Sequence, residues 1–266
     1  RASQLGLKTA VIERESLGGI CLNWGCIPTK ALLKSANVFD YIQHAEDFGI
    51  NVASPEADFG GMIGRSRDVA DGMSKGVTFL LKKNKVDVIM GSGKVLTGKR
   101  IEVTANEGGT QVLEANNIII ATGARSRELP TLKQDGNKII GYREALTLQS
   151  QPKKMVVVGS GAIGVEFAYF YNAIGTEVTV VEYMDSVVPV EDKEIGKQLG
   201  RSLKKQGISL KTSSEVTSVD TSGSGCKVTV KTKKGEEVIE CDIVLSAVGV
   251  VANIENIGLE DVGIAT

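Results

Sequence analysis

The sequence has little of several features that would define other classes of protein. It contains one histidine, five prolines and 5% aromatic residues among 266 residues. Its longest apolar runs, such as residues 118–121 and 155–158, are far shorter than the roughly 20 residues that cross a bilayer. Its 31 basic residues are balanced by 32 acidic ones, and no basic stripe offers a footprint for a phosphate backbone. We therefore expect neither a membrane protein nor a nucleic-acid partner.

Glycine is what the sequence has in excess. Its 31 glycines gather in short loops between Val/Ile runs, as in α/β proteins whose backbone approaches phosphates. With 42% apolar and 24% charged residues, the chain can bury the core of one or two globular domains. It opens at Arg1 in what reads as the tail of a helix, so we expect it to be incomplete.

The chain repeats one supersecondary plan twice. Residues 5–13 match residues 174–182 position by position: a glycine ends a helix, a short apolar strand follows, and an acid lies seven positions after the glycine. Residues 118–123 and 244–249 each predict a buried strand that closes on Ala-x-Gly.

Predicted strands and helices alternate between these repeated segments. The pattern predicts strands over 86–90, 100–104, 208–211 and 227–231, and helices over roughly 28–48, 59–84 and 192–206. This order fits two tandem α/β units of Rossmann type, each a parallel sheet with a small antiparallel meander. A boundary is predicted near residues 148–153.

A dinucleotide fingerprint opens the second copy. The apolar strand 155–158 runs into Gly159-Ser160-Gly161-Ala162-Ile163-Gly164 and a helix. The first glycine would make the tight turn, the second would admit a pyrophosphate, and the third would let the helix pack on the strand. Glu182, 18 residues after Gly164, stands where a carboxylate binds a ribose 2′-hydroxyl. The alternative is a glycine-rich turn with a surface glutamate.

The first copy carries the acid, Glu13, without its glycine loop. The counterpart of Gly164 would lie eleven residues before Gly6, off the start of the chain. We therefore expect that a phosphate loop is missing. The alternative is that Glu13 is a solvated carboxylate at a strand end.

Two cysteines five positions apart form the most specific stretch, residues 18–30. Pro28 suits the first turn of a helix, which places Cys26 at the helix N-terminus, where the dipole favours a thiolate. A zinc site is not expected, because neither Cys226 nor Cys241 has metal-ligand spacing. These residues favour a redox pair over two unrelated buried thiols.

The stretch Gly-Gly-x-Cys-Leu-Asn-x-Gly-Cys-Ile-Pro-x-Lys resembles the redox-active disulfide signature of the class I pyridine nucleotide-disulfide oxidoreductases, most closely those that act on dihydrolipoamide. The resemblance covers essentially the whole chain. It implies an FAD-binding domain over 1–148, an NAD-binding domain over 149–254, and a return toward the first domain over 255–266. The family's C-terminal interface domain has no counterpart here, so the resemblance also implies that this chain alone is inactive.

The resemblance assigns roles residue by residue. Cys21 would exchange with substrate, and Cys26 would make the charge-transfer contact with the flavin. The residues implied at FAD are Glu13, Gly18, Gly19, Lys30, Gly93, Ala121, Thr122 and Gly123. Those implied at NAD are Gly159, Ser160, Gly161, Ala162, Ile163, Gly164, Glu166, Glu182, Val216 and Gly249. No metal is implied, and His44 matches no catalytic position and reads as a solvated helix residue.

The implied activity passes electrons from protein-bound dihydrolipoamide through the Cys21–Cys26 disulfide and FAD to NAD⁺. The implied partners are lipoyl domains of 2-oxoacid dehydrogenase complexes and a second copy of the chain. For the compartment, a bacterial cytoplasm is favoured over a mitochondrial matrix. Glu182, with no basic residue over 183–188, favours NAD over NADP. The alternatives are a glutathione or mercuric reductase, or a non-catalytic dinucleotide-binding fragment.

Overall fold

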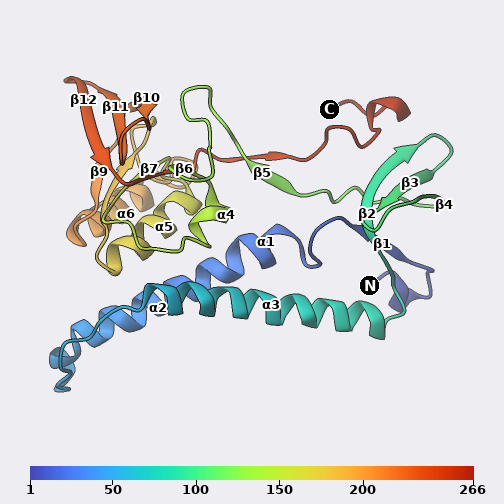
Figure 1. Cartoon of the computed structure of the whole chain (residues 1–266), viewed down its shortest axis with the longest axis horizontal. Coiled ribbons are helices and arrows are strands. Elements are labelled where there is room, and N and C mark those ends of the chain that lie inside the picture. Colours follow the sequence, from blue (N-terminus) through green and yellow to red (C-terminus); the bar gives the residue numbers. More distant parts are fainter. The chain divides into compact units, whose positions relative to one another are not determined.

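The computed structural model describes residues 1–266 and divides them into two compact units. Unit 1 comprises Arg1–Asn23, Ala70–Arg125 and Ala252–Thr266, and unit 2 comprises Trp24–Val69 and Ser126–Val251. The chain therefore passes between the units more than once. Figure 1 traces this path by colour. None of its helices combines the length and apolar character that crossing a membrane requires.

Unit 1 is built on a four-stranded sheet in the order β1-β2-β3-β4. Its strands are β1 (Ala10–Glu13), β2 (Asp87–Leu96), β3 (Arg100–Ala105) and β4 (Thr110–Glu114). β1 pairs with β2 in parallel, and β2, β3 and β4 form an antiparallel meander. The end of the chain returns to this sheet, because the N–H of Val95 donates to the carbonyl of Ile257 at 2.8 Å. The remaining elements confined to unit 1 are η1 (Ser3–Leu5) and η3 (Glu260–Val262).

Unit 2 is built on a five-stranded sheet in the order β6-β13-β7-β8-β9, in which every pair is parallel. Its strands are β6 (Ile139–Ile140), β7 (Lys154–Val158), β8 (Glu177–Val181), β9 (Ser209–Lys211) and β13 (Ile243–Ser246). β7 is buried from Met155 to Val158, as expected of a strand covered on both faces. The sequence prediction of this strand is confirmed.

The other helices are α1 (Gly19–Trp24), α2 (Cys26–Gln43), η2 (Ala45–Phe48), α3 (Phe59–Lys83), α4 (Tyr142–Ala145), α5 (Ala162–Ala173) and α6 (Lys193–Lys205). Of these, α4, α5 and α6 contact the parallel sheet of unit 2. α5 packs on β7 and β8 and against α2, which explains its buried Phe167, Phe170 and Tyr171. α6 begins where the Asp192 carboxylate accepts from the N–H of Glu194 at 2.8 Å, a normal N-cap.

A second meander completes unit 2. It consists of β10 (Glu215–Asp220), β11 (Cys226–Thr232) and β12 (Gly235–Cys241), all antiparallel. Its buried side chains share one core with the parallel sheet: Val216, Val228 and Val230 cluster with Val156 and Val244. The predicted pairing of a parallel sheet with a small antiparallel meander is confirmed in this unit.

One predicted strand is wrong. Residues 118–121 form no strand, and Ile119 is 88% exposed. Their counterpart β13 lies between two parallel neighbours, β6 and β7, whereas no strand flanks residues 118–121. A strand without a partner leaves its backbone polar groups unpaired, so the apolar run alone does not form one. Just beyond it, β5 (Ala124–Ser126) pairs with β14 (Val250–Ala252).

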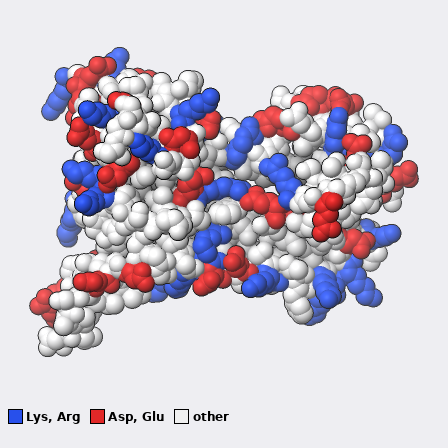
Figure 2. All heavy atoms as spheres, in the orientation of Figure 1, with Lys and Arg blue, Asp and Glu red and all other residues white.

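The surface mixes charges of both signs. On the face drawn in Figure 2, Lys and Arg side chains alternate with Asp and Glu, and no single-sign patch dominates. This agrees with the net charge of −1.

Candidate functional site

A disulfide joins Cys21 and Cys26 at the start of α2. Cys21 belongs to α1, Gly25 separates the two helices, and Cys26 is the first residue of α2. Both cysteines are exposed. The predicted pairing is therefore confirmed, and it lies between two exposed residues.

Glycine and asparagine shape the turn that carries Cys21. Gly18 and Gly19 have φ of +107° and +72°, a region that side chains disfavour. The buried Asn23 amide donates to the carbonyls of Leu17 at 3.0 Å and Gly19 at 2.9 Å. The glycines and the Asn23 side chain, all within this segment, thus stabilise the turn.

The position of Cys26 at a helix N-terminus has a chemical consequence. The first intrahelical bond runs from the N–H of Thr29 to the carbonyl of Gly25 at 3.1 Å. The preceding N–H groups of α2 have no intrahelical acceptor, so the N-terminus carries partial positive charge. A thiolate at Cys26 would be stabilised there once the disulfide is opened.

Lys30 and Glu166 form an ion pair between α2 and α5. The family resemblance implied that Lys30 lies at the flavin and Glu166 at the nicotinamide, and it did not predict that the two side chains touch. The carboxylate is less exposed than the ammonium group, at 30% against 60%. About one turn further along α5 and two turns further along α2, the Tyr169 hydroxyl donates to the Asn37 side chain at 2.5 Å, which fastens the same two helices together.

The glycine loop after β7 leaves room for a phosphate where the fingerprint requires it. Gly159 has φ +98°, and a Cβ there would lie 2.5 Å from the carbonyl oxygen of Ala247. A Cβ on Gly164 would lie 2.0 Å from the carbonyl oxygen of Gly159, so this glycine allows the helix to approach the strand. A Cβ on Gly161 would meet nothing within 4 Å. The loop therefore fits a dinucleotide pyrophosphate over Gly161, beside the N-terminus of α5.

Glu182 closes the far side of this loop. It is 7% exposed, and one carboxylate oxygen accepts from the N–H and the hydroxyl of Ser160, both at 2.7 Å. The other oxygen accepts from the N–H of Met184 at 2.8 Å. The surface-glutamate alternative is therefore wrong, and the carboxylate is fixed against the glycine loop.

The other residues expected at NAD have differing surroundings. Ala162 and Ile163 begin α5 directly after the loop. Val216 is 8% exposed and belongs to the core cluster of unit 2. Gly249 has φ +109°, and its carbonyl accepts from the N–H of Arg127 at 2.9 Å.

The residues expected at FAD in unit 1 lie at strand ends and turns. Glu13 ends β1, and its carboxylate accepts from the N–H of Glu15 at 2.7 Å. Gly93 lies within β2, where a Cβ would make ordinary contacts with Ile101 and Ile12. The turn Ala121-Thr122-Gly123 is held by Asn253, whose N–H donates to the carbonyl of Gly123 at 3.0 Å. Asn253 has no local sequence signal, because it lies 130 residues away.

Sequence reasoning also missed two arginines beside the cysteine stretch. Arg67 of α3 and Arg143 of α4 both stack on the ring of Trp24. Because both arginines are far from Trp24 in the sequence, no local motif could have predicted these contacts.

The remaining candidates have structural surroundings. Cys226 and Cys241 are free and buried, which confirms that they take no part in the disulfide. Burial is the main cause that raises the pKa of the Cys241 thiol to about 12. His44 caps the end of α2 on the surface and contacts Asp40 of the same helix, as a solvated helix residue does.

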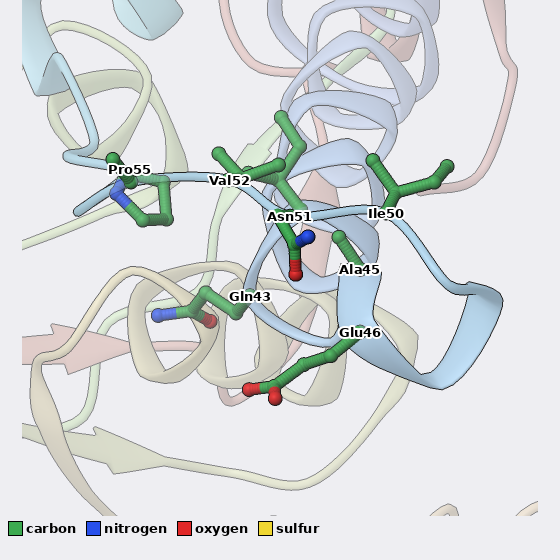
Figure 3. Close-up of a pocket in the computed structure, with 9 residues that line it drawn as sticks. Gln43, Ala45, Glu46, Ile50, Asn51, Val52 and Pro55 are labelled. Atoms are coloured by element: carbon green, nitrogen blue, oxygen red, sulfur yellow. The ribbon is translucent and has the colours of Figure 1, made fainter.

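A pocket of about 390 Å³ lies at the C-terminal end of α2. Figure 3 shows it between the helix end and the following connection, with Gln43 and Glu46 near Ile50, Val52 and Pro55. No residue of the predicted site lines it. It is therefore not the candidate site.

Together, an exposed disulfide at a helix N-terminus and a parallel sheet with a dinucleotide loop define a nucleotide-dependent disulfide oxidoreductase. The model of the pyridine nucleotide-disulphide oxidoreductase family matches residues 1–266, and the chain belongs to this family. Its members are FAD- and NAD(P)-dependent flavoproteins.

The chain is similar to particular members of this family. It is 47% identical to a dihydrolipoyl dehydrogenase of Rhizobium etli, over 100% of this chain and 59% of that protein. It is 46% identical to a dihydrolipoyl dehydrogenase of Zymomonas mobilis, over 99% and 57%. Among solved structures, LpdA of Mycobacterium tuberculosis has a TM-score of 0.88 at 31% identity, over 97% of this chain and 56% of that one. The chain thus spans less than two thirds of the length of these proteins.

Proposed function

We propose that the complete protein reoxidises dihydrolipoyl groups carried on a protein partner and passes the electrons to NAD⁺. One observation carries the proposal: an exposed Cys21–Cys26 disulfide at the N-terminus of α2 in a chain nearly half identical to proteins named dihydrolipoyl dehydrogenase. The partners would be lipoyl domains of 2-oxoacid dehydrogenase complexes, with the protein working as a homodimer. We place it in a bacterial cytoplasm, because the relatives at 46–47% identity are bacterial.

The two cysteines divide the first step between them. A substrate thiolate attacks the sulfur of Cys21, and Cys26 leaves as a thiolate, which the N-terminus of α2 favours. The second substrate thiolate then attacks the substrate sulfur of the mixed disulfide, and Cys21 leaves as a thiolate. This releases oxidised lipoamide and leaves a reduced Cys21–Cys26 pair that has gained two electrons. FAD and NAD⁺, when bound, would supply the chemistry that carries these electrons away as hydride.

Unit 1 would supply most of the FAD contacts and unit 2 the NAD contacts. In domain terms, we assign FAD binding to residues 1–148 and NAD binding to 149–254, with 255–266 returning toward the first domain. Glu13, Gly93 and the turn at Thr122 would contact FAD, and the Lys30–Glu166 ion pair would lie where the two cofactors meet. The open face of Gly161 supports the dinucleotide site.

Glu182 supports a preference for NAD over NADP. A carboxylate can accept from a free ribose 2′-hydroxyl, whereas a 2′-phosphate would meet like charge. The oxygens of Glu182 are fixed by Ser160 and Met184, so the group cannot turn away at little cost. We expect kcat/KM for NAD⁺ to exceed that for NADP⁺ by about one to two decades.

Steady-state kinetics on the complete protein test the proposal. We expect dihydrolipoamide to reduce NAD⁺, and Cys21→Ser to abolish this reaction while Cys226→Ser leaves it intact. NADPH-dependent reduction of glutathione disulfide or Hg²⁺ would instead assign a glutathione or mercuric reductase. Failure of all three reactions in a protein that holds FAD would overturn the enzyme assignment.

A further inference from the structure

The only tryptophan of the chain lies between the two disulfide cysteines. Two guanidinium groups stack on its ring: the central carbon of Arg67 is 4.4 Å from the ring centroid, and that of Arg143 is 4.9 Å away. Both distances are within the roughly 6 Å range of a cation–π contact. Two segments remote in sequence thus place positive charge on Trp24, one of the four residues between Cys21 and Cys26.

Both arginines are presented by anchored backbone. Next to Arg67, the Ser66 hydroxyl is buried and donates to the carbonyl of Ile63 at 2.7 Å, and the Arg65 guanidinium ties α3 to α2 by donating to the carbonyl of Ala31 at 2.8 Å. Arg143 stands in the single turn of α4, where the side chain of Glu144 accepts from the N–H of Gly141 at 2.9 Å. The two cations are therefore held in place before any reaction.

We propose that Trp24, Arg67 and Arg143 form a clamp that positions the disulfide segment and favours its reduced, anionic form. The disulfide is neutral, whereas its two-electron reduction product carries a thiolate and takes up one proton on the other sulfur. Fixed positive charge nearby stabilises the thiolate and leaves the neutral disulfide unaffected. The three side chains are positioning residues, and the inference rests on the proposed function for its biological role.

Three variants of the complete protein separate charge from shape. R67Q/R143Q removes both charges, and R67K/R143K keeps them on a different side chain. R201Q removes one exposed arginine of α6, which hydrogen-bonds to Gln198, and serves as the matched control. Each variant is equilibrated with reduced and oxidised glutathione, quenched by alkylation, and its Cys21 and Cys26 thiols are quantified by mass spectrometry.

We expect R67Q/R143Q to shift the exchange equilibrium about tenfold toward the disulfide, a potential about 30 mV more negative. R67K/R143K should restore most of the wild-type value, and R201Q should equal it. If the double Gln variant does not fold, R143Q alone should give about a threefold shift. An unchanged equilibrium, or an equal shift in the Lys variant, would overturn the role of charge.

The glutathione equilibrium does not depend on dihydrolipoamide turnover. A wild-type protein that fails to oxidise dihydrolipoamide would refute the proposed function alone, whereas equal equilibria in wild type and the Gln variants would refute the clamp alone.

Discussion

At the scale of single residues, the glycine loop offers a matched pair of substitutions. Gly164→Ala would place a Cβ 2.0 Å from a backbone oxygen, so we expect the free energy of unfolding to fall by about 3 kcal/mol. Gly161→Ala meets nothing within 4 Å and should change stability by less than about 0.5 kcal/mol. It should nevertheless weaken NAD binding about tenfold or more, because the methyl group would occupy the pyrophosphate position.

Chemical denaturation and NAD titration of the two variants separate packing from ligand contact. Gly223→Ala, in a loop where a Cβ also has open space, is the control and should change neither quantity. Normal NAD binding by Gly161→Ala would contradict the assignment of the pyrophosphate to this loop.

A second prediction at the residue scale concerns the exposed pair Arg125 and Glu255. The Arg125 guanidinium holds the Glu255 carboxylate at 2.7 and 3.0 Å, and this hydrogen bonding lowers the pKa of Glu255 from its usual 4.5 to about 2. A lowered pKa means that the pair contributes to stability above pH 4.5 and that this contribution is lost as the pH falls toward 2.

Carbon-13 NMR of the Glu255 carboxyl group measures this pKa directly. The midpoint should lie near 2 in the wild type and return toward the ordinary glutamate value in Arg125→Gln. A wild-type midpoint at the ordinary glutamate value would show that Arg125 does not hydrogen-bond the Glu255 carboxylate in solution.

At the scale of elements, the cross-strand pair Cys226 and Cys241 joins β11 to β12 in register. Burial raises the pKa of both thiols, to about 12 for Cys241, so few thiolates are present at pH 8. After reduction of the native protein, we expect two thiols to react quickly with a disulfide reagent and two only on unfolding. Four fast thiols would contradict the burial of this meander.

The sequence predicted those elements whose packing depends on residues that are contiguous in the chain. β7, the glycine loop and α5 could be predicted because a buried apolar run, a glycine triplet and a helical stripe are contiguous in sequence. Residues 118–121 carry the same apolar signal, yet they form no strand, since no neighbouring strand pairs with them. An apolar run therefore indicates a tendency toward burial, but it forms a strand only where a neighbouring strand can pair with it.

The residues of the candidate site could likewise be predicted only where their chemistry depends on the local sequence. Cys21, Cys26 and Glu182 could be found from spacing, because the chemistry of each depends on a nearby turn or helix end. The contacts of Trp24 with Arg67 and Arg143, and of Lys30 with Glu166, could not. They join α1 to α3 and α4, and α2 to α5, across long separations in sequence, and only the folded chain brings these side chains together.

At the scale of the whole molecule, the proposed function passes electrons from a substrate dithiol through the disulfide to the cofactors. The balanced surface charge offers no general steering toward an acidic partner. We therefore expect the protein to distinguish dihydrolipoamide from glutathione by local contacts at the disulfide. Weak dependence of kcat/KM on ionic strength would support this, and a steep dependence would oppose it.

The most direct test of the central claim follows the two cysteines through one turnover. The complete protein, loaded with FAD, is mixed with one equivalent of dihydrolipoamide without NAD⁺, alkylated and mapped by mass spectrometry. We predict new thiols at Cys21 and Cys26 alone, and their return to the disulfide when NAD⁺ is added before alkylation. A bridge that stays closed while dihydrolipoamide reduces NAD⁺ would contradict the account.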